Sequence, residues 1–352
     1  MNVAGEPSFR DSVDLMFKRA VALMDMSPGL QEKIRVCNST YTVRFGVRLR
    51  GKIETFTGYR SVHSEHMEPV KGGIRYALSV HQDEVEALAS VRLMEAGATR
   101  LQAKPVARSI RLAERDGVRS HGFMYLPIYA EHLACGKVDG KAEPEMSRPR
   151  AAAVVVDAAH GFAHPAIDLG FPTLVEAARS SGIAAMTLRR SYNCGILGHH
   201  AERLAEAGMI GLCFTHAPAS IAPAGAKLPV IGTNPFALAV PDEHGGARFV
   251  LDQSASVVAK SEVILRSRRG ESIPEGWALD ARGNPTTDPD AALKGSMLPS
   301  GGAKGFGVGL LVEVLASVLS GAVASRDASP FSGPAGGPPA TGQCFIAIDP
   351  AA

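Results

Sequence analysis

The strongest constraint on the fold is the alternation of short apolar runs with amphipathic stretches after residue 152. Residues 152–156 and 183–188 are apolar runs of strand length, whereas residues 165–179 and 197–207 have helical spacing. Strands that alternate with helices in this way are typical of an α/β layer structure. The same patterns predict further strands at residues 209–214, 236–240, 249–251 and 345–348, a helix at residues 308–319, and a loop over the Pro- and Gly-rich residues 329–342.

The first part of the chain has a different pattern. Ser8 is a candidate N-cap for a helix that runs to Leu23. Residues 41–50 and 53–59 alternate apolar and polar side chains, which predicts a hairpin with one solvent-facing side.

Helical patterning follows this hairpin. It begins near Gln82 and resumes from Pro105 to Arg115, and glycines interrupt it at Gly97 and Gly117. The sequence therefore predicts three segments. These are a small α+β fragment at 1–81, a helical segment at 82–150 and an α/β domain at 151–352.

Composition excludes several classes of protein. The chain has 352 residues, 45% of them hydrophobic, and a net charge of +2, which predicts a soluble globular protein with no affinity for nucleic acid or an anionic membrane. Its five cysteines form no C-x-x-C pair and no apolar leader or membrane span is visible, so reduced thiols and a cytoplasmic location are expected.

Five short segments carry a resemblance to a known family. In this order they resemble the malate/L-lactate dehydrogenase family, which comprises nicotinamide-dependent 2-oxo-acid reductases without a Rossmann fold. The resemblance implies a non-Rossmann, mixed-sheet three-layer core over about residues 82–352, with NAD or NADP as cofactor and a small 2-oxo or 2-hydroxy acid as substrate. The segments are residues 119–122, 157–166, 191–195, 232–235 and 301–306.

The N-terminal part resembles a different family. Residues 34–45, 59–66 and 69–76 are similar to the dimerisation domain of the Glu/Leu/Phe/Val dehydrogenases over about residues 7–90. In that family Lys71 would hold a substrate carboxylate. Because the family's catalytic lysine segment and its separate Rossmann domain do not follow residue 90, Lys71 is expected to be structural.

Two resemblances in one chain predict a fusion of two gene fragments. Members of the malate/L-lactate family usually continue for several dozen residues past the position of Pro350, so a C-terminal truncation is also expected. Both parent families self-associate, which implies a homodimer.

The resemblance places the proton donor at His121, with Ser120 as its hydrogen-bonding partner. Imidazole titrates near neutrality, which suits general acid catalysis. Without the resemblance, the simpler interpretation is that this histidine caps the end of the helix that breaks at Gly117. A supporting carboxylate of some relatives falls at His200, so the His199–His200 pair is either a relay or a solvated helix turn.

The expected substrate site departs from the family. Tyr125 stands where relatives carry an arginine that clamps the substrate carboxylate, and Asn193 stands where many have a histidine. A phenol cannot make a bidentate ionic pair, so Arg119 and Arg190 are candidate replacements. The identity of the acid is therefore open, and a cyclic imino acid is an alternative substrate.

The resemblance places the dinucleotide at three loops and beside one serine. Helix N-termini offer free N–H groups to phosphates, and Lys304 adds a cation. The simpler interpretations are an Asn-Pro turn, a flexible glycine hinge, and Ser254 or Ser256 as a helix cap. The expected cofactor residues are His160, Gly161, Phe162, His164, Thr233, Asn234, Pro235, Ser254, Gly302, Ala303 and Lys304.

Other functions find less support in the sequence. His63 with His66, and His160 with His164, have tolerable metal-ligand spacings but no clustered cysteines or carboxylates, so no metal is expected. Two alternatives stay open. One is an amino-acid dehydrogenase that acts through the N-terminal half, and the other is an inactive fusion that serves at most as an oligomerisation module.

Overall fold

The computed structural model describes residues 39–49, 52–62 and 82–352, in two compact units, Met1–Val85 and Glu86–Ala352. The helix predicted from Ser8 and the Lys71 segment lie outside the described residues. In the first unit, β1 (Ser39–Leu49) pairs with β2 (Lys52–Val62) in an antiparallel ladder. The predicted hairpin is confirmed.

The second unit begins with helices. Thr99 caps α4, where its side chain accepts a hydrogen bond from the Gln102 backbone N–H at 3.4 Å, and the helix stops before Gly117 as predicted. Two single turns of 3-10 helix then carry residues 119–121 and 123–125. The sequence did not predict the helix that follows, α5. The helices are α3 (Gln82–Glu95), α4 (Arg100–Arg115) and α5 (Leu126–Ala134).

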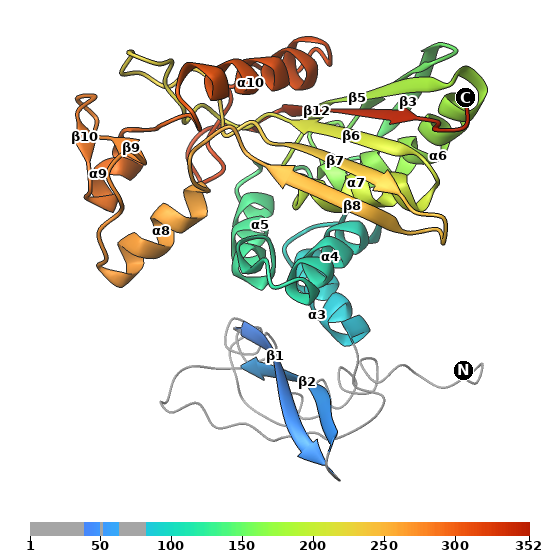
Figure 1. The fold of residues 1–352 in the computed structure, drawn as a ribbon, viewed down its shortest axis with the longest axis horizontal. Coiled ribbons are helices and arrows are strands. Elements are labelled where there is room, and N and C mark those ends of the chain that lie inside the picture. The colour runs from blue at the N-terminus through green and yellow to red at the C-terminus, as the bar shows by residue number, and fades with distance from the viewer. Residues whose placement is uncertain (1–38, 50–51, 63–81) are drawn as a thin grey trace. The chain divides into compact units, whose positions relative to one another are not determined.

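A seven-stranded sheet forms the centre of this unit, in the order β3-β4-β5-β12-β6-β7-β8 (Figure 1). Only β4 and β5 run parallel, whereas the other neighbouring pairs are antiparallel. The sheet is therefore mixed, unlike the all-parallel order of a Rossmann domain. Its strands are β3 (Glu145–Arg150), β4 (Ala153–Asp157), β5 (Ile183–Ser191), β6 (Ile210–Thr215), β7 (Phe236–Pro241), β8 (Ala247–Gln253) and β12 (Thr341–Ile348).

Helices cover both faces of the sheet. α6 (Ala163–Ser181) and α7 (Leu197–Glu206) pack on one face, and α10 (Ala303–Glu313) with the π-helix Val314–Val318 lies on the other, as Figure 1 shows. Side chains alternate between faces along a strand. Accordingly, Phe345 joins the core under α6 and α7, and its neighbour Cys344 joins the core under α10. The predicted three-layer, non-Rossmann α/β core is confirmed.

A smaller layer that the sequence did not reveal lies beside the sheet. Its core contains Ile221, Ile231 and Val263, and the Arg266 guanidinium lies over the Trp277 ring at 5.0 Å from the centroid. Its three strands are only two residues long, too short for a period-2 pattern. Its elements are α8 (Lys260–Arg269), β9 (Ala278–Leu279), β10 (Pro285–Thr286), α9 (Pro289–Lys294) and β11 (Ser296–Met297).

Candidate active site

The predicted acid lies on the 3-10 turn that follows α4. Ser120 Oγ is 3.1 Å from His121 Nδ1, so the serine orients the imidazole. Burial and the nearby His199 ring lower the pKa of His121, which keeps the half-buried ring neutral at pH 7. This arrangement leaves Nε2 as the nitrogen that Ser120 does not occupy.

His199, and not His200, is the histidine that acts on His121. His199 Nε2 lies 2.9 Å from Asp116 Oδ2, whereas His200 is buried with its Nε2 bonded to the Cys194 carbonyl at 2.8 Å. The His200 ring packs against Phe171 and Phe345 in the sheet core. His200 is therefore a core residue here, which corrects the expectation that it supports the acid. Either histidine of the pair fitted the sequence, and only the packing distinguishes them.

Asp116, Ser120, His121 and His199 form what we call the His121 cluster. Helix α7 links it to β8, because Asp252 Oδ2 accepts the Gly198 backbone N–H at 2.7 Å and the His199 ring acts on the Asp252 carboxyl. Burial, the larger effect, raises the pKa of Asp252. Sequence reasoning missed Asp116 and Asp252, since neither belongs to a motif.

A cavity of about 460 Å³ is lined by Gln253, at the end of β8, and by residues that follow it, and we call it the Lys304 cavity. Two of the expected cofactor residues, Ser254 and Lys304, line it together. The Ser300 N–H donates to the Ala255 carbonyl at 2.9 Å, which joins its two walls. Its other lining residues are Gln253, Ala255, Ser256, Val257, Val258, Ala259, Ser300, Gly305 and Val308.

This cavity has the features that a dinucleotide phosphate requires. Helix α10 begins beside it at Gly302, with no side chain capping its N-terminus, and Ala303 is exposed. A Cβ added at Gly301 or Gly302 would meet nothing within 4 Å, so the approach to the first turn of the helix is open, although the Gly302 N–H itself donates to the Pro299 carbonyl at 3.2 Å. Free N–H groups and a lysine suit an anion.

Neither serine caps α8, contrary to one expectation. The helix begins at Lys260 after Ala259, which provides no side-chain cap. Ser256 Oγ instead donates to the Val258 carbonyl at 2.7 Å and lies 3.0 Å from Ser254 Oγ. Ser254 is half-buried at the cavity wall and keeps capacity to bond a ligand.

Four of the expected cofactor residues are buried. Three of them lie in or directly after the loop between β4 and α6, and the fourth, Asn234, lies in the loop at residues 232–235. Phe162 is fully buried against the Tyr129 and Tyr192 rings, with centroids 5.4 and 5.7 Å away. A Cβ on Gly161 would lie 2.8 Å from Ala142 Cβ, so Gly161 is required by close packing. The four expected cofactor residues that are buried within the protein in this structure are Gly161, Phe162, His164 and Asn234.

Asn234 shows the reason most clearly. Its side chain is fully buried, donates to the Gly309 carbonyl at 2.9 Å and to Glu313 Oε2 at 2.8 Å, and accepts the Ala217 N–H at 3.2 Å. The amide thus holds the 232–235 loop against α10. Its neighbours Thr233 and Pro235 are half-buried, and the Thr233 carbonyl accepts the N–H of Ala255 at the cavity wall.

Backbone strain accompanies several of the predicted residues. Within the described part of the chain, five non-glycine residues have positive φ, and His160, Arg190 and Asn234 are among them, at 65°, 47° and 36°. Strain of this kind persists only where the surroundings impose it and often marks functional loops. Here it sets the turns that end β4 and β5.

The Arg190 side chain forms an ion pair with Asp157. Its Nε lies 2.8 Å from Asp157 Oδ1, and Arg189 Nε lies 3.0 Å from Asp157 Oδ2, so two arginines share one carboxylate. No described contact joins Arg190 to Ser120, His121 or Tyr125. The structure therefore does not bring this candidate clamp to the His121 cluster, and the description of Arg119 does not extend to its side chain.

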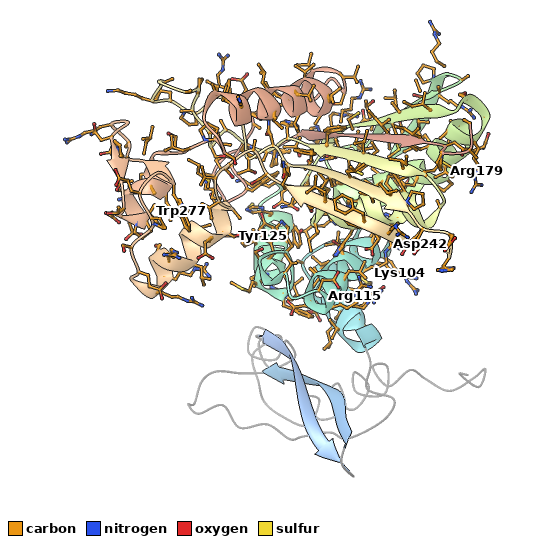
Figure 2. All side chains as sticks on the ribbon, viewed as in Figure 1. Lys104, Arg115, Tyr125, Arg179, Asp242 and Trp277 are labelled. Atoms are coloured by element: carbon orange, nitrogen blue, oxygen red, sulfur yellow. The ribbon has the colours of Figure 1, made fainter. Side chains whose placement is uncertain are left out.

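Tyr125 and Asn193 do lie together. The Tyr125 hydroxyl interacts with Asn193 and with the Tyr192 hydroxyl, and burial raises its pKa above the ordinary value. Figure 2 labels Tyr125, which directly precedes α5. The Tyr125 and Tyr129 rings meet edge to face at 4.7 Å between centroids. A half-buried phenol thus stands four residues after His121, at the expected carboxylate-binding position.

Two further findings concern other kinds of site. Among the described residues, no helix combines the length and apolar character needed to cross a bilayer. Within the same residues, no three His, Cys, Asp or Glu side chains are placed to hold a metal ion.

Comparison with known proteins identifies the second unit. Residues 80–352 match the malate/L-lactate dehydrogenase family, and residues 38–103 match the dimerisation domain of the Glu/Leu/Phe/Val dehydrogenases. Both predicted resemblances are confirmed. They overlap in residues 80–103, a range that begins just before α3 and ends in α4.

Curated relatives and solved structures support the larger match. The (2R)-3-sulfolactate dehydrogenase (NADP(+)) of Chromohalobacter salexigens is 43% identical over 270 residues, 76% of this chain and 80% of the relative. The Δ1-pyrroline-2-carboxylate reductase of Ancylobacter novellus is 42% identical over 76% of this chain and 78% of its own length. The Δ1-piperideine-2-carboxylate reductase structure from Pseudomonas syringae superposes with a TM-score of 0.74 at 35% identity, covering 78% of this chain and 83% of the other. The chain belongs to the malate/L-lactate dehydrogenase family.

Proposed function

We propose that this protein is an NAD(P)-dependent oxidoreductase that interconverts a small 2-oxo acid and its 2-hydroxy acid. The observation that carries the proposal is the Ser120–His121 pair, a half-buried imidazole oriented by a hydroxyl 3.1 Å away. Relatives named as an NADP(+)-dependent dehydrogenase and as reductases support the reaction type. The proposed working form is a cytoplasmic homodimer.

One set of residues is placed to bind the cofactor. The nicotinamide cofactor supplies the hydride when it is bound. Lys304, Ser254 and the uncapped first turn of α10 at Ala303 hold its phosphates and ribose. Asp252, next in the chain to the cavity residue Gln253, accepts the N–H of Gly198, which directly precedes His199 in α7.

The His121 ring takes up a proton from solvent before the reduction step, and this protonated ring gives its proton to the substrate oxygen as negative charge develops there. Ser120 holds the ring through Nδ1, so Nε2 is the nitrogen that transfers the proton. The His199–Asp116 pair beside the ring limits how readily it becomes positively charged, because His199 lowers the pKa of His121. In the reverse direction the neutral ring accepts the proton of the hydroxy acid.

Removal of the imidazole tests the proposal. We expect His121→Ala to lower kcat by at least about a hundredfold in an NADPH-oxidation assay, with cofactor affinity little changed. His244→Ala is the matched control, since that histidine is 84% exposed in the turn between β7 and β8. An unaltered rate in His121→Ala would remove His121 from the mechanism.

A second candidate substrate is a cyclic imino acid. Tyr125 stands where the family resemblance implies an arginine that clamps the substrate carboxylate, and several relatives are named pyrroline- or piperideine-carboxylate reductases. Comparing Δ1-pyrroline-2-carboxylate with pyruvate and sulfopyruvate as NADPH oxidants separates the candidates. A thermal-shift titration with NADPH and NADH, which must raise the unfolding temperature if either binds the native state, identifies the cofactor.

A further inference from the structure

A buried carboxylate joins two loops to the end of helix α10. Glu313, the last residue of that helix, is 8% exposed. Its Oε1 accepts the Ser325 backbone N–H at 2.7 Å, and its Oε2 accepts the Ser325 hydroxyl and the Asn234 side-chain amide, the latter at 2.8 Å. All three partners are donors, which is the arrangement that a carboxylate requires. Glu313 therefore fixes where the two loops meet the helix.

The orientation of the Asn234 amide is determined at both of its ends. Its Oδ1 accepts the Ala217 backbone N–H at 3.2 Å, and its Nδ2 donates to the Gly309 carbonyl at 2.9 Å as well as to Glu313. A backbone N–H only donates and a carbonyl only accepts, so turning the amide over would break both backbone contacts. The side chain is fully buried, and bulk water cannot replace either partner. Asn234 therefore always presents an N–H group to Glu313.

These side-chain contacts hold the Asn234 backbone in an uncommon conformation. Its φ of 36° lies in the left-handed region, which costs free energy for residues other than glycine and persists only where the surroundings impose it. The loop has no room to relax toward Ala217, because a Cβ added at Gly232 would lie 2.1 Å from the Ala217 carbonyl oxygen. We therefore expect residues 232–235 to keep their shape only while Asn234 is held on α10.

The shape of this loop reaches the Lys304 cavity through one backbone hydrogen bond. The Thr233 carbonyl, directly before Asn234, accepts the Ala255 N–H at 2.8 Å, and Ala255 lies in the cavity wall next to Ser254. Helix α10 packs directly on the same wall, since a Cβ added at Gly309 would lie 3.0 Å from Ala255 Cβ. A movement of Asn234 away from the helix therefore moves the wall that carries Ser254.

We propose that Glu313 is a positioning residue for the nicotinamide cofactor, because it holds the Asn234 loop and, through Thr233 and Ala255, sets this wall of the cavity. The inference rests on the proposed function, since the ligand of the Lys304 cavity is the proposed cofactor. Glu313 itself does not line the cavity. Its loss should therefore weaken cofactor binding and leave the chemical step at His121 unchanged once the cofactor is bound.

Hydrogen exchange measures this coupling without any ligand. Glu313→Met keeps a side chain of similar length and removes both carboxylate oxygens. We expect mass spectrometry of the full chain to show at least about tenfold faster exchange in peptides that contain the Ala255 amide, because its acceptor moves with Asn234. Ser325→Ala is the matched control, since it removes one hydrogen bond from the same carboxylate and leaves the Asn234 contact in place. We expect its exchange at Ala255 to match the wild type.

Cofactor binding measures the consequence. Fluorescence titration should give about tenfold weaker NADPH binding in Glu313→Met, and binding within about twofold of the wild type in Ser325→Ala. kcat at saturating NADPH should stay within about threefold of the wild type in both variants. A merely structural role would lower the stability and the folded fraction of both variants, without this division between affinity and rate.

An exchange of the two functional groups assigns the effect to the Glu313–Asn234 pair. Asn234→Asp sets one carboxylate against another and should weaken NADPH binding. Adding Glu313→Gln to that variant restores a donor and an acceptor at the contact, with their places exchanged, and keeps an oxygen for the Ser325 N–H. Both variants lack the donor to Gly309, so comparing them isolates the contact with Glu313. We expect the double variant to bind NADPH more tightly than Asn234→Asp alone.

Three results would each overturn the proposal. They are equal NADPH affinities in Glu313→Met and Ser325→Ala, unchanged exchange at Ala255 in Glu313→Met, and a double variant that binds no better than Asn234→Asp. If Glu313→Met does not fold, the comparison of Asn234→Asp with the double variant decides. A wild-type chain that binds neither NADPH nor NADH refutes the proposed function instead, and exchange at Ala255 then decides whether Glu313 sets the cavity wall.

Discussion

The first residues of α6 make the second unit sensitive to acid through one histidine. His164 is 2% exposed, and burial, followed by the charges of Arg108 and Arg203, lowers its pKa to about 3. The ordinary value, which applies in the unfolded chain, is 6.5. Between these two values the unfolded state binds a proton that the folded state does not. Stability is therefore retained above pH 6.5 and lost as the pH falls from 6.5 toward 3.

Linkage gives the size of the effect. One proton bound only in the unfolded state changes the free energy of unfolding by about 1.4 kcal/mol per pH unit. At pH 5, His164 alone should cost about 2 kcal/mol relative to pH 7. Burial also lowers the pKa of His200, which adds a similar dependence of its own.

The variant His164→Leu isolates the contribution of His164. Urea unfolding followed by circular dichroism at several pH values between 5 and 7 gives the slope of unfolding free energy against pH. We expect a shallower slope in His164→Leu, by about 1.4 kcal/mol per pH unit near pH 5, and an unchanged slope in the control His244→Leu. Identical slopes for wild type and His164→Leu would refute the argument, whatever the absolute stabilities.

Three other predictions test the remaining parts of the site. Asn234→Ala should reduce the free energy of unfolding by about 2–3 kcal/mol in urea, because it leaves the buried Glu313 carboxylate short of a partner, whereas Asn284→Ala in an exposed turn should change little. Lys304→Gln should weaken NADPH binding by about tenfold in a fluorescence titration, with Lys294→Gln, at an exposed helix end, as its control. Since burial and His199 lower the pKa of His121 below 6.5, kcat/KM for reduction should fall as the pH rises through that pKa, and the oxidation rate should rise; a profile flat from pH 5 to 8 would exclude this role.

The pattern of the chain predicted the architecture because burial follows periodicity. The apolar runs at residues 183–188 and 209–214 became β5 and β6, since a strand covered on both faces needs apolar side chains throughout. The helical pattern at residues 308–319 became the end of α10 and the π-helix Val314–Val318, but the π geometry and the two-residue strands β9 to β11 had no such signature. Their positions depend on contacts with distant segments.

The candidate site was predictable only where the side chain itself is exposed to a ligand. Ser254 and Lys304 do line one cavity, whereas His164 and Asn234, in equally suggestive motifs, are buried. A motif contains residues that fix the shape of a loop as well as residues that contact a ligand. Burial and hydrogen-bond partners distinguish the two roles, and neither property can be read from the sequence.

The position of β12 has a consequence for how this protein folds in the cell. This strand comes last along the sheet's sequence order, yet it lies between β5 and β6 and pairs with both. A nascent chain that lacks residues 341–348 exposes two unpaired strand edges at the middle of its sheet. The central layer can close only after residues 341–348 have left the ribosome, so folding of the unit depends on protection of those edges until then.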